Sequence, residues 1–400
     1  MPGATAGSIR SVISAPAVAR TFALALVGRL AYGLLPLCLL FTIRDASGSF
    51  AVAATASAAL GFATLAMPLQ ARLVDRHGQR RVLPCYALCY VSLLVAAATL
   101  SRGTHSDGAW VGLSLLLGLS APALGPAMRA QWREIAPEGA PRRVAYSLDS
   151  IGEESLYLVG PLGASVVLAT GPPRVGLLIA AAFVAVGVAG LLASPYVPPV
   201  GAAPKADGHR GRSVGTLRRR GLPGLLLVVA LFGAGAAACL VGVAALADDA
   251  GKPSVVGVVE AAMAVGAVVA GLAWARLRRE PSWSAAVAVL LVVSAAAQAG
   301  TVVAAPHLFV VGAFFIVTGA MAAPVYVVAF TAADGLVAPE QRTEASTWVS
   351  TSLNGGNAVG TALAGLAVAL GSAAPFGLAT GLTGVAAVLV LAIKSPGPIP

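Results

Sequence analysis

Residues 71–83 read Ala-Arg-Leu-Val-Asp-Arg-His-Gly-Gln-Arg-Arg-Val-Leu and form a short, strongly cationic segment between two long apolar runs. A segment of this length is too small to be a domain, so we expect it to reverse the chain at a membrane surface. Only 10% of the 400 residues are charged and 58% are hydrophobic, whereas about 25% are charged in soluble domains. The composition therefore predicts a polytopic membrane protein.

Apolar runs long enough to cross a bilayer recur along the whole chain. One crossing takes about 20 predominantly apolar residues, and twelve such runs are separated by short polar segments. The sequence thus predicts an all-α membrane protein with twelve transmembrane helices. The expected spans cover roughly residues 20–42, 49–69, 82–101, 109–132, 144–169, 174–195, 222–246, 254–275, 283–304, 307–331, 345–370 and 375–393.

The distribution of basic residues gives the expected orientation. If both termini are cytoplasmic, Lys and Arg concentrate on cytoplasmic segments; the exceptions are Arg44, Arg102, Arg174 and Lys252 outside and Arg29 within a span. This is the positive-inside pattern, and it predicts a multi-pass protein of the cell membrane with cytoplasmic termini. The net charge of +10 does not indicate nucleic-acid binding, because the basic residues are scattered over separate segments rather than gathered on one face.

The chain divides into two similar halves. A polar stretch rich in Arg, Pro and Gly predicts a linker at 197–221 between six-helix bundles at 1–196 and 222–400. Ala121-Pro122 recurs as Ala323-Pro324, and 136–138 recurs as 338–340. Further on, Arg142, Ala145, Ser150, Val159 and Gly160 align with Arg342, Ala345, Ser350, Val359 and Gly360. Paired repeats of this kind are typical of transporters, and they predict two pseudo-symmetric bundles.

The 71–83 segment resembles the signature loop between helices 2 and 3 of the major facilitator superfamily. The matching residues are Leu73, Asp75, Arg76, Gly78, Arg80 and Arg81, and Ala71 replaces the first glycine of the family pattern. The resemblance implies two bundles around a central cavity that opens alternately to each side of the membrane. It also implies that Asp75 helps to latch the cytoplasmic side shut, so we expect Asp75, Arg76, Gly78, Arg80 and Arg81 to form a gating loop.

Ionisable residues inside a span are costly and therefore candidates for function. Glu153 and Glu154 lie near mid-depth of the fifth span, and Arg29 lies at similar depth in the first. We expect Arg29 to pair with one of these acids and the other to carry a proton; a structural pair that joins the two helices is the alternative. Asp149 is shallower and is expected to be hydrated. Drug/proton antiporters of the family carry an arginine in helix 4, and Arg129 lies too near the cytoplasmic end to replace it.

Several other polar residues are candidates for a substrate cavity, with helix packing as the alternative for each. They are Tyr32, Tyr157, Glu260, Tyr326, Asn354 and Asn357. Glu260 is the deep acid of the second half, whereas the two amides occupy the positions that the internal repeat pairs with Glu154 and Tyr157.

The remaining patterns limit the classes of function. The four cysteines lie inside spans without His or carboxylate partners, which predicts neither a disulfide nor a metal site. The chain has no phosphate-binding Gly-Lys-Ser/Thr motif and no clustered catalytic groups, so we expect no cofactor and no enzyme. We predict a monomeric, proton-coupled secondary transporter that exports a small amphipathic molecule. A symporter or uniporter for uptake of a metabolite is one alternative, and a membrane sensor or enzyme is another.

Overall fold

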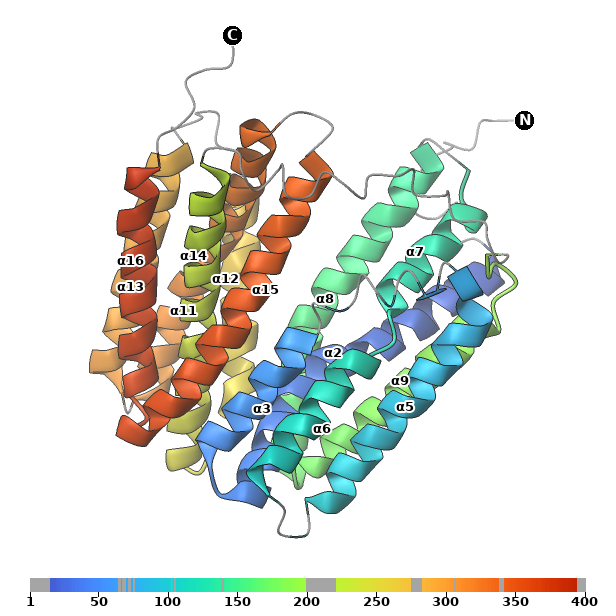
Figure 1. Ribbon diagram of the computed structural model, residues 1–400, viewed down its shortest axis with the longest axis horizontal. Helices are drawn as coiled ribbons and strands as arrows, with labels where there is room; N and C mark the ends of the chain where they lie inside the picture. The colour runs from blue at the N-terminus through green and yellow to red at the C-terminus, as the bar shows by residue number, and fades with distance from the viewer. Residues whose placement is uncertain are drawn as a thin grey trace. The chain divides into compact units, whose positions relative to one another are not determined.

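The computed structural model describes most of the chain. The described residues are 15–63, 66, 70, 73–74, 76–101, 103, 106–137, 140–198, 221–274, 283–305, 307–337 and 342–393. Among them, regular structure is entirely helical. Figure 1 shows these helices as two sets of long rods.

The described helices follow the spans predicted from hydropathy. In chain order they are α2 (Pro16–Ser47), α3 (Phe50–Ala63), α5 (Gln79–Leu100), α6 (Asp107–Ser120), α7 (Leu124–Ile135), α8 (Ala140–Thr170), α9 (Arg174–Leu192), α11 (Leu222–Asp249), α12 (Val255–Trp274), α13 (Trp283–Ala304), α14 (Leu308–Leu336), α15 (Arg342–Ala367) with a 3-10 turn at Val368–Leu370, and α16 (Ala374–Ala392). Within the described ranges, ten segments are long and apolar enough to cross a membrane, with α6 and α7 counted as one. The shorter α3 and the charge-bearing α8 occupy the other two expected spans.

The chain forms two compact units. Helices α2 and α5 to α9 make up unit 1, whereas α3 and α11 to α16 make up unit 2. The short α3 therefore clusters with α15, although it follows α2 in sequence. The expected linker at 197–221 lies almost wholly outside the described residues, and the division into bundles at 1–196 and 222–400 stays a prediction.

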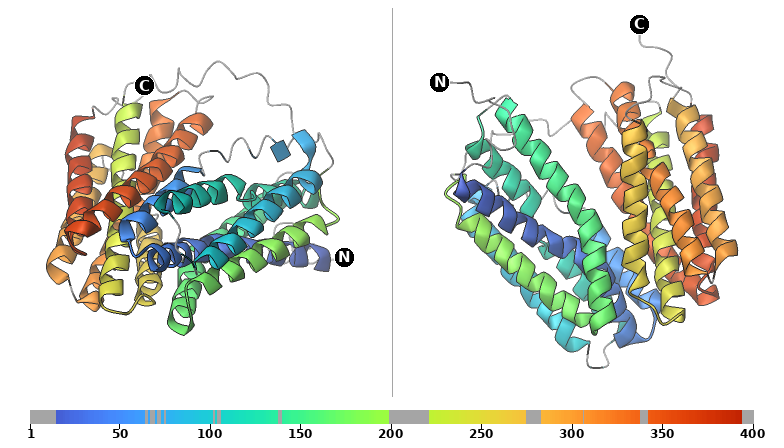
Figure 2. Two further views of the ribbon diagram at one scale, coloured as in Figure 1. Left: turned by 60° about the horizontal axis from the view of Figure 1, so that its bottom comes forward. Right: turned by 180° about the vertical axis from the view of Figure 1, so that it is seen from behind.

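Glycines bring the helices of unit 1 into backbone contact. Helix α2 packs against both α8 and α9 (Figure 2). A Cβ added to Gly160 would meet the backbone of Gly33, and one added to Gly187 would meet the backbone of Gly28. In a membrane, helices associate by close packing of small residues rather than by the hydrophobic effect. These glycines consequently fix where α2 crosses its neighbours.

The same contact recurs in unit 2. Helix α15 packs against α11, where a Cβ on Gly360 would meet the backbone of Ala234 and one on Gly356 would meet that of Ala230. Gly160 and Gly360 are the residues that the internal repeat aligns, and their partners Gly33 and Ala234 are 201 residues apart (234 − 33). The repeat therefore relates the packing of α2 on α8 to that of α11 on α15.

Candidate functional site

The fourth span is broken, and the break positions the site. Residues 121–123 are not helical, so α7 begins afresh at Leu124. Pro122 lacks a backbone N–H and interrupts the helical hydrogen bonds. Side chains satisfy the freed carbonyls: Tyr32 donates to the carbonyl of Pro122, and Nε2 of Gln70 donates to that of Leu119 at 2.7 Å. The N-terminus of α7 thus faces α2 in the interior of unit 1.

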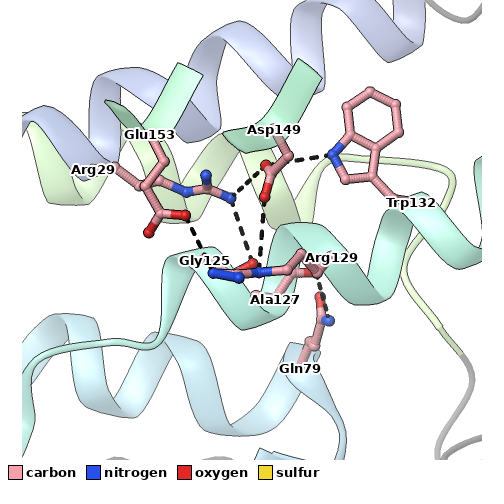
Figure 3. A network of polar contacts seen from close by, with 8 residues as sticks. All are labelled: Arg29, Gln79, Gly125, Ala127, Arg129, Trp132, Asp149 and Glu153. Carbon is pink, nitrogen blue, oxygen red and sulfur yellow. Dashed lines mark hydrogen bonds and ion pairs between the residues drawn. The ribbon is translucent and has the colours of Figure 1, made fainter. Parts of the chain in front are cut away.

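A buried ion pair joins α2 to α8 beside this break. Nη2 of Arg29 lies 3.0 Å from Oδ1 of Asp149, with side chains only 4% and 3% exposed (Figure 3). The same Nη2 donates to the carbonyl of Gly125 in the first turn of α7 at 3.4 Å. Nε1 of Trp132, also on α7, donates to Oδ1 of Asp149 at 3.4 Å. Three helices therefore converge on one buried carboxylate.

A second, more exposed pair adjoins the first. Nη2 of Arg129 lies 3.3 Å from Oε2 of Glu153, and Nε of Arg129 lies 3.8 Å from Oδ2 of Asp149. The side chains of Arg129 and Glu153 are 46% and 37% exposed. Asp149 and Glu153 share one face of α8 because they are four residues apart. Arg129 therefore contacts both carboxylates. Below, the name ionic cluster refers to Arg29, Arg129, Asp149 and Glu153.

This geometry corrects two expectations from the sequence. Arg29 pairs with Asp149, whereas Glu153 pairs with Arg129. Asp149 is buried rather than hydrated. Arg129, which the sequence did not assign to this site, also belongs to the cluster. A constant rise per residue along a straight helix specifies the depth of a residue but not the direction of its side chain. The break at 121–123 starts a new helix and redirects its side chains toward α8.

Buried amides hold the opposite face of α7. Nε2 of Gln131 donates to Oε1 of Gln79 at 3.2 Å and to the carbonyl of Leu191 at 2.9 Å. Nε2 of Gln79 in turn donates to the carbonyl of Ala127 at 3.1 Å. Gln79 is the first residue of α5 and lies within the cationic segment 71–83. Helix α7 is therefore fixed to this loop on one face and to the ionic cluster on the other.

The expected gating loop is described only in part. Arg76, Arg80 and Arg81 are exposed, and Gly78 precedes α5 with φ of 84°, a value that suits glycine. Asp75 lies outside the described residues, as do the side chains of Glu154 and Tyr157 in α8.

The remaining cavity candidates are divided between the two units. Tyr32 packs edge-on against Tyr90 at 6.2 Å in unit 1, and Tyr326 packs against Phe232 at 5.7 Å in unit 2. The other candidates, all in unit 2, are Glu260, Asn354 and Asn357. Glu260 on α12 is partly buried, as is Asn357 on α15, whereas Asn354 is exposed.

The ionic cluster has an apolar counterpart in unit 2. The repeat relates α8 to α15 with an offset of 200 residues, which aligns Asp149 with Val349 and Glu153 with Leu353. It relates α2 to α11 with an offset of 201, which aligns Arg29 with Ala230. Val349 belongs to a buried apolar cluster, against which Leu353 packs. Ion pairing at this position of the repeat is therefore a property of unit 1.

Comparison with known proteins identifies the family. A model described as Major Facilitator Superfamily matches residues 18–277, more than half of the chain. The chain belongs to the major facilitator superfamily. It is accordingly a multi-pass membrane transporter of small molecules rather than an enzyme, as the cationic loop predicted. No curated protein matches this sequence.

Solved structures share the fold at low identity. The nucleoside transporter NupG has a TM-score of 0.75 and 15% identity over 94% of this chain and 97% of its own. A bacterial homologue of the iron transporter ferroportin, in an inward-facing state, has a TM-score of 0.71 and 15% identity over 97% of this chain and 100% of its own. The peptide transporter POT in complex with alafosfalin has a TM-score of 0.71 and 16% identity over 96% of this chain and 94% of its own. These similarities show the fold. The substrate class has to be inferred from the residues of this chain.

Proposed function

We propose that this transporter is coupled to protons and that Glu153 carries the proton. Glu153 is 37% exposed, whereas Asp149 is 3% exposed. Asp149 accepts from Arg29 and Trp132, and its Oδ2 lies 3.8 Å from Nε of Arg129. Glu153 has one ion-pair partner among the described residues, Arg129. Of the two acids, Glu153 is therefore the more exposed one, with fewer ion-pair partners among the described residues.

Protonation of Glu153 would change the partner of Arg129. Once neutral, Glu153 no longer holds Arg129, whose Nε already lies 3.8 Å from Oδ2 of Asp149. Arg129 would then move toward Asp149 and carry the first turns of α7 with it. Charge-assisted hydrogen bonds are roughly twice as strong as neutral ones, and about 1.4 kcal/mol alters an equilibrium tenfold. The exchange is thus large enough to bias alternating access.

We further propose that the chain acts as a monomer in the cell membrane, with cytoplasmic termini, and exports a small amphipathic molecule. The resemblance of the cationic loop to the family signature supports the gating loop, and the distribution of Lys and Arg supports the orientation. Uptake by symport is the second candidate, because the two arginines of the ionic cluster suit a substrate that travels with a proton.

Proton movement in proteoliposomes tests this proposal. Vesicles with an internal pH-sensitive dye would be exposed to a panel of amphipathic cations, neutral nucleosides and organic anions. We expect at least one class to move protons through the parent protein and not through Glu153→Gln, while substrate exchange without a gradient persists. Arg133→Gln, an exposed arginine on the same helix, is the matched control. A substrate that crosses without proton movement in the parent protein would overturn the proposal.

A further inference from the structure

We propose that the first turn of α7 and the two arginines of the ionic cluster bind an anionic group, a carboxylate or a phosphate, of the transported molecule. This inference rests on the proposed proton site at Glu153 and adds the class of substrate. It arises from the charge of the cluster, from the helix break at 121–123, and from donors on Arg29 that have no acceptor in the described part of the chain.

The charges of the cluster balance only while Glu153 is ionised. Arg29 and Arg129 contribute two positive charges, and Asp149 and Glu153 contribute two negative ones. A proton on Glu153 leaves a net charge of one positive unit beside Arg129, whose side chain is 46% exposed. In the interior of a bilayer such an uncompensated charge is costly. A single anionic group is the ligand that restores neutrality.

The broken span supplies a helix N-terminus at this point. Helix α7 runs for 12 residues from Leu124, and the first amides of a helix attract anions. Gly125 lies in its first turn, where an added Cβ would come 3.0 Å from Nη2 of Arg129 and 3.8 Å from Oε1 of Glu153. Glycine consequently leaves the backbone bare where the exposed guanidinium meets α7.

Arg29 provides a second observation in favour of an anion site, independent of the N-terminus of α7. Its side chain is 4% exposed and reaches the first turn of α7 through Gly125. Its Nε and Nη1 are buried and have no acceptor among the described residues. Buried donors are nearly always satisfied in folded proteins, so these two nitrogens of Arg29 are available to a ligand as far as the described residues show.

Other ionisable residues lie on the helices that surround Glu153. Helix α2 contributes Arg29, and α9 bears its one ionisable side chain, Arg174, at its far end. The remaining ionisable residues of the three helices that carry the cluster are Arg20, Tyr32, Cys38, Arg44 and Asp45 on α2, Arg133 and Glu134 on α7, and Arg142, Arg143, Tyr146, Glu154 and Tyr157 on α8. Of these, Arg133 and Glu134 are exposed near the end of α7.

Proton and anion should therefore promote each other's binding. The proton removes the carboxylate that competes for Arg129, and the anion compensates the charge that the proton creates. By linkage, each ligand raises the affinity for the other by the same factor. Two ligands that bind together are carried together, so an anionic substrate favours the second candidate function, uptake by symport, over export.

Binding of simple probes to the purified full-length transporter tests the site. Calorimetric titrations would use benzoate, inorganic phosphate and, as the matched cation, benzylamine. We expect benzoate or phosphate to bind at least about tenfold more tightly in acidic than in alkaline buffer. The Glu153→Gln variant should bind the anion tightly in both the acidic and the alkaline buffer. Benzylamine should not bind. Failure of both anions to bind Glu153→Gln, or equal binding of benzylamine, would overturn the site.

Further variants assign the binding to the cluster and separate the two proposals. Arg129→Gln should abolish anion binding and Gly125→Ala should weaken it, whereas Arg133→Gln should leave it unchanged; thermal unfolding confirms that each variant is folded. Unchanged binding in a folded Arg129→Gln protein contradicts the site. If Glu153→Gln stops proton movement without tightening anion binding, the proton site stands and the anion site falls. If proton movement continues in Glu153→Gln, the proposed function itself is wrong.

Discussion

Arg29 and Asp149 form an ion pair at 3.0 Å whose side chains are 4% and 3% exposed, and this pair fixes α2 to α8 inside unit 1. Removal of one partner from a buried pair leaves an uncompensated charge, whereas replacement of both by apolar residues is often tolerated. The pair therefore has a structural role that can be separated from proton transfer at Glu153.

The first prediction concerns this pair. Arg29→Leu should lower the free energy of unfolding by about 3 kcal/mol, because Asp149 is left buried beside the more distant Arg129. Arg29→Leu/Asp149→Leu should recover most of that loss. Thermal or denaturant unfolding of the three proteins measures both effects. A double variant no more stable than Arg29→Leu would show that the two side chains do not act as a pair.

The fold could be predicted from the sequence, whereas the partners within the cluster could not. Hydropathy gave the spans because every apolar run of suitable length must satisfy its backbone within a helix in lipid. The depth of Arg29 and Glu153 was also informative, since both lie in one cluster. Depth does not specify direction, however. Only the break at Pro122 turns Arg129 toward α8, and the spacing of Asp149 and Glu153 by four residues was the available signal for one shared site.

The second prediction concerns helix contact in unit 2. Gly356→Ala should destabilise the protein by about 1–3 kcal/mol, because its Cβ would meet the backbone of Ala230. Gly355→Ala is the matched control, since nothing lies within 4 Å of a Cβ there. The control should be neutral or slightly stabilising, as alanine favours helices over glycine. Equal thermal stability of the two variants would argue against backbone contact between α11 and α15.

The third prediction concerns the amides that hold α7. Gln131→Leu removes the donor to Gln79 and to the carbonyl of Leu191, both at buried positions. An unfolding free energy lower by about 1–3 kcal/mol is expected. Glu134→Gln, an exposed change on the same helix, should have no effect. If Gln131→Leu is as stable as this control, the amides do not anchor α7.

The fourth prediction concerns the proposed gating loop. Asp75→Asn should leave expression intact and favour the inward-open state, because the latch suggested by the family resemblance loses its charge. A Ser350→Cys substitution in a background without native cysteines should then be labelled faster from the cytoplasmic side. Labelling at the parent rate would mean that the loop acts only as a basic topology signal.

The assignment of the proton to Glu153 can be tested without knowledge of the substrate. Infrared difference spectra of the purified protein between alkaline and acidic buffer report the carbonyl band of each carboxylic acid that gains a proton. We predict that a titrating band is present in the parent protein and in Asp149→Asn and is lost in Glu153→Gln. A band that persists in Glu153→Gln and disappears in Asp149→Asn or Glu154→Gln would contradict the account.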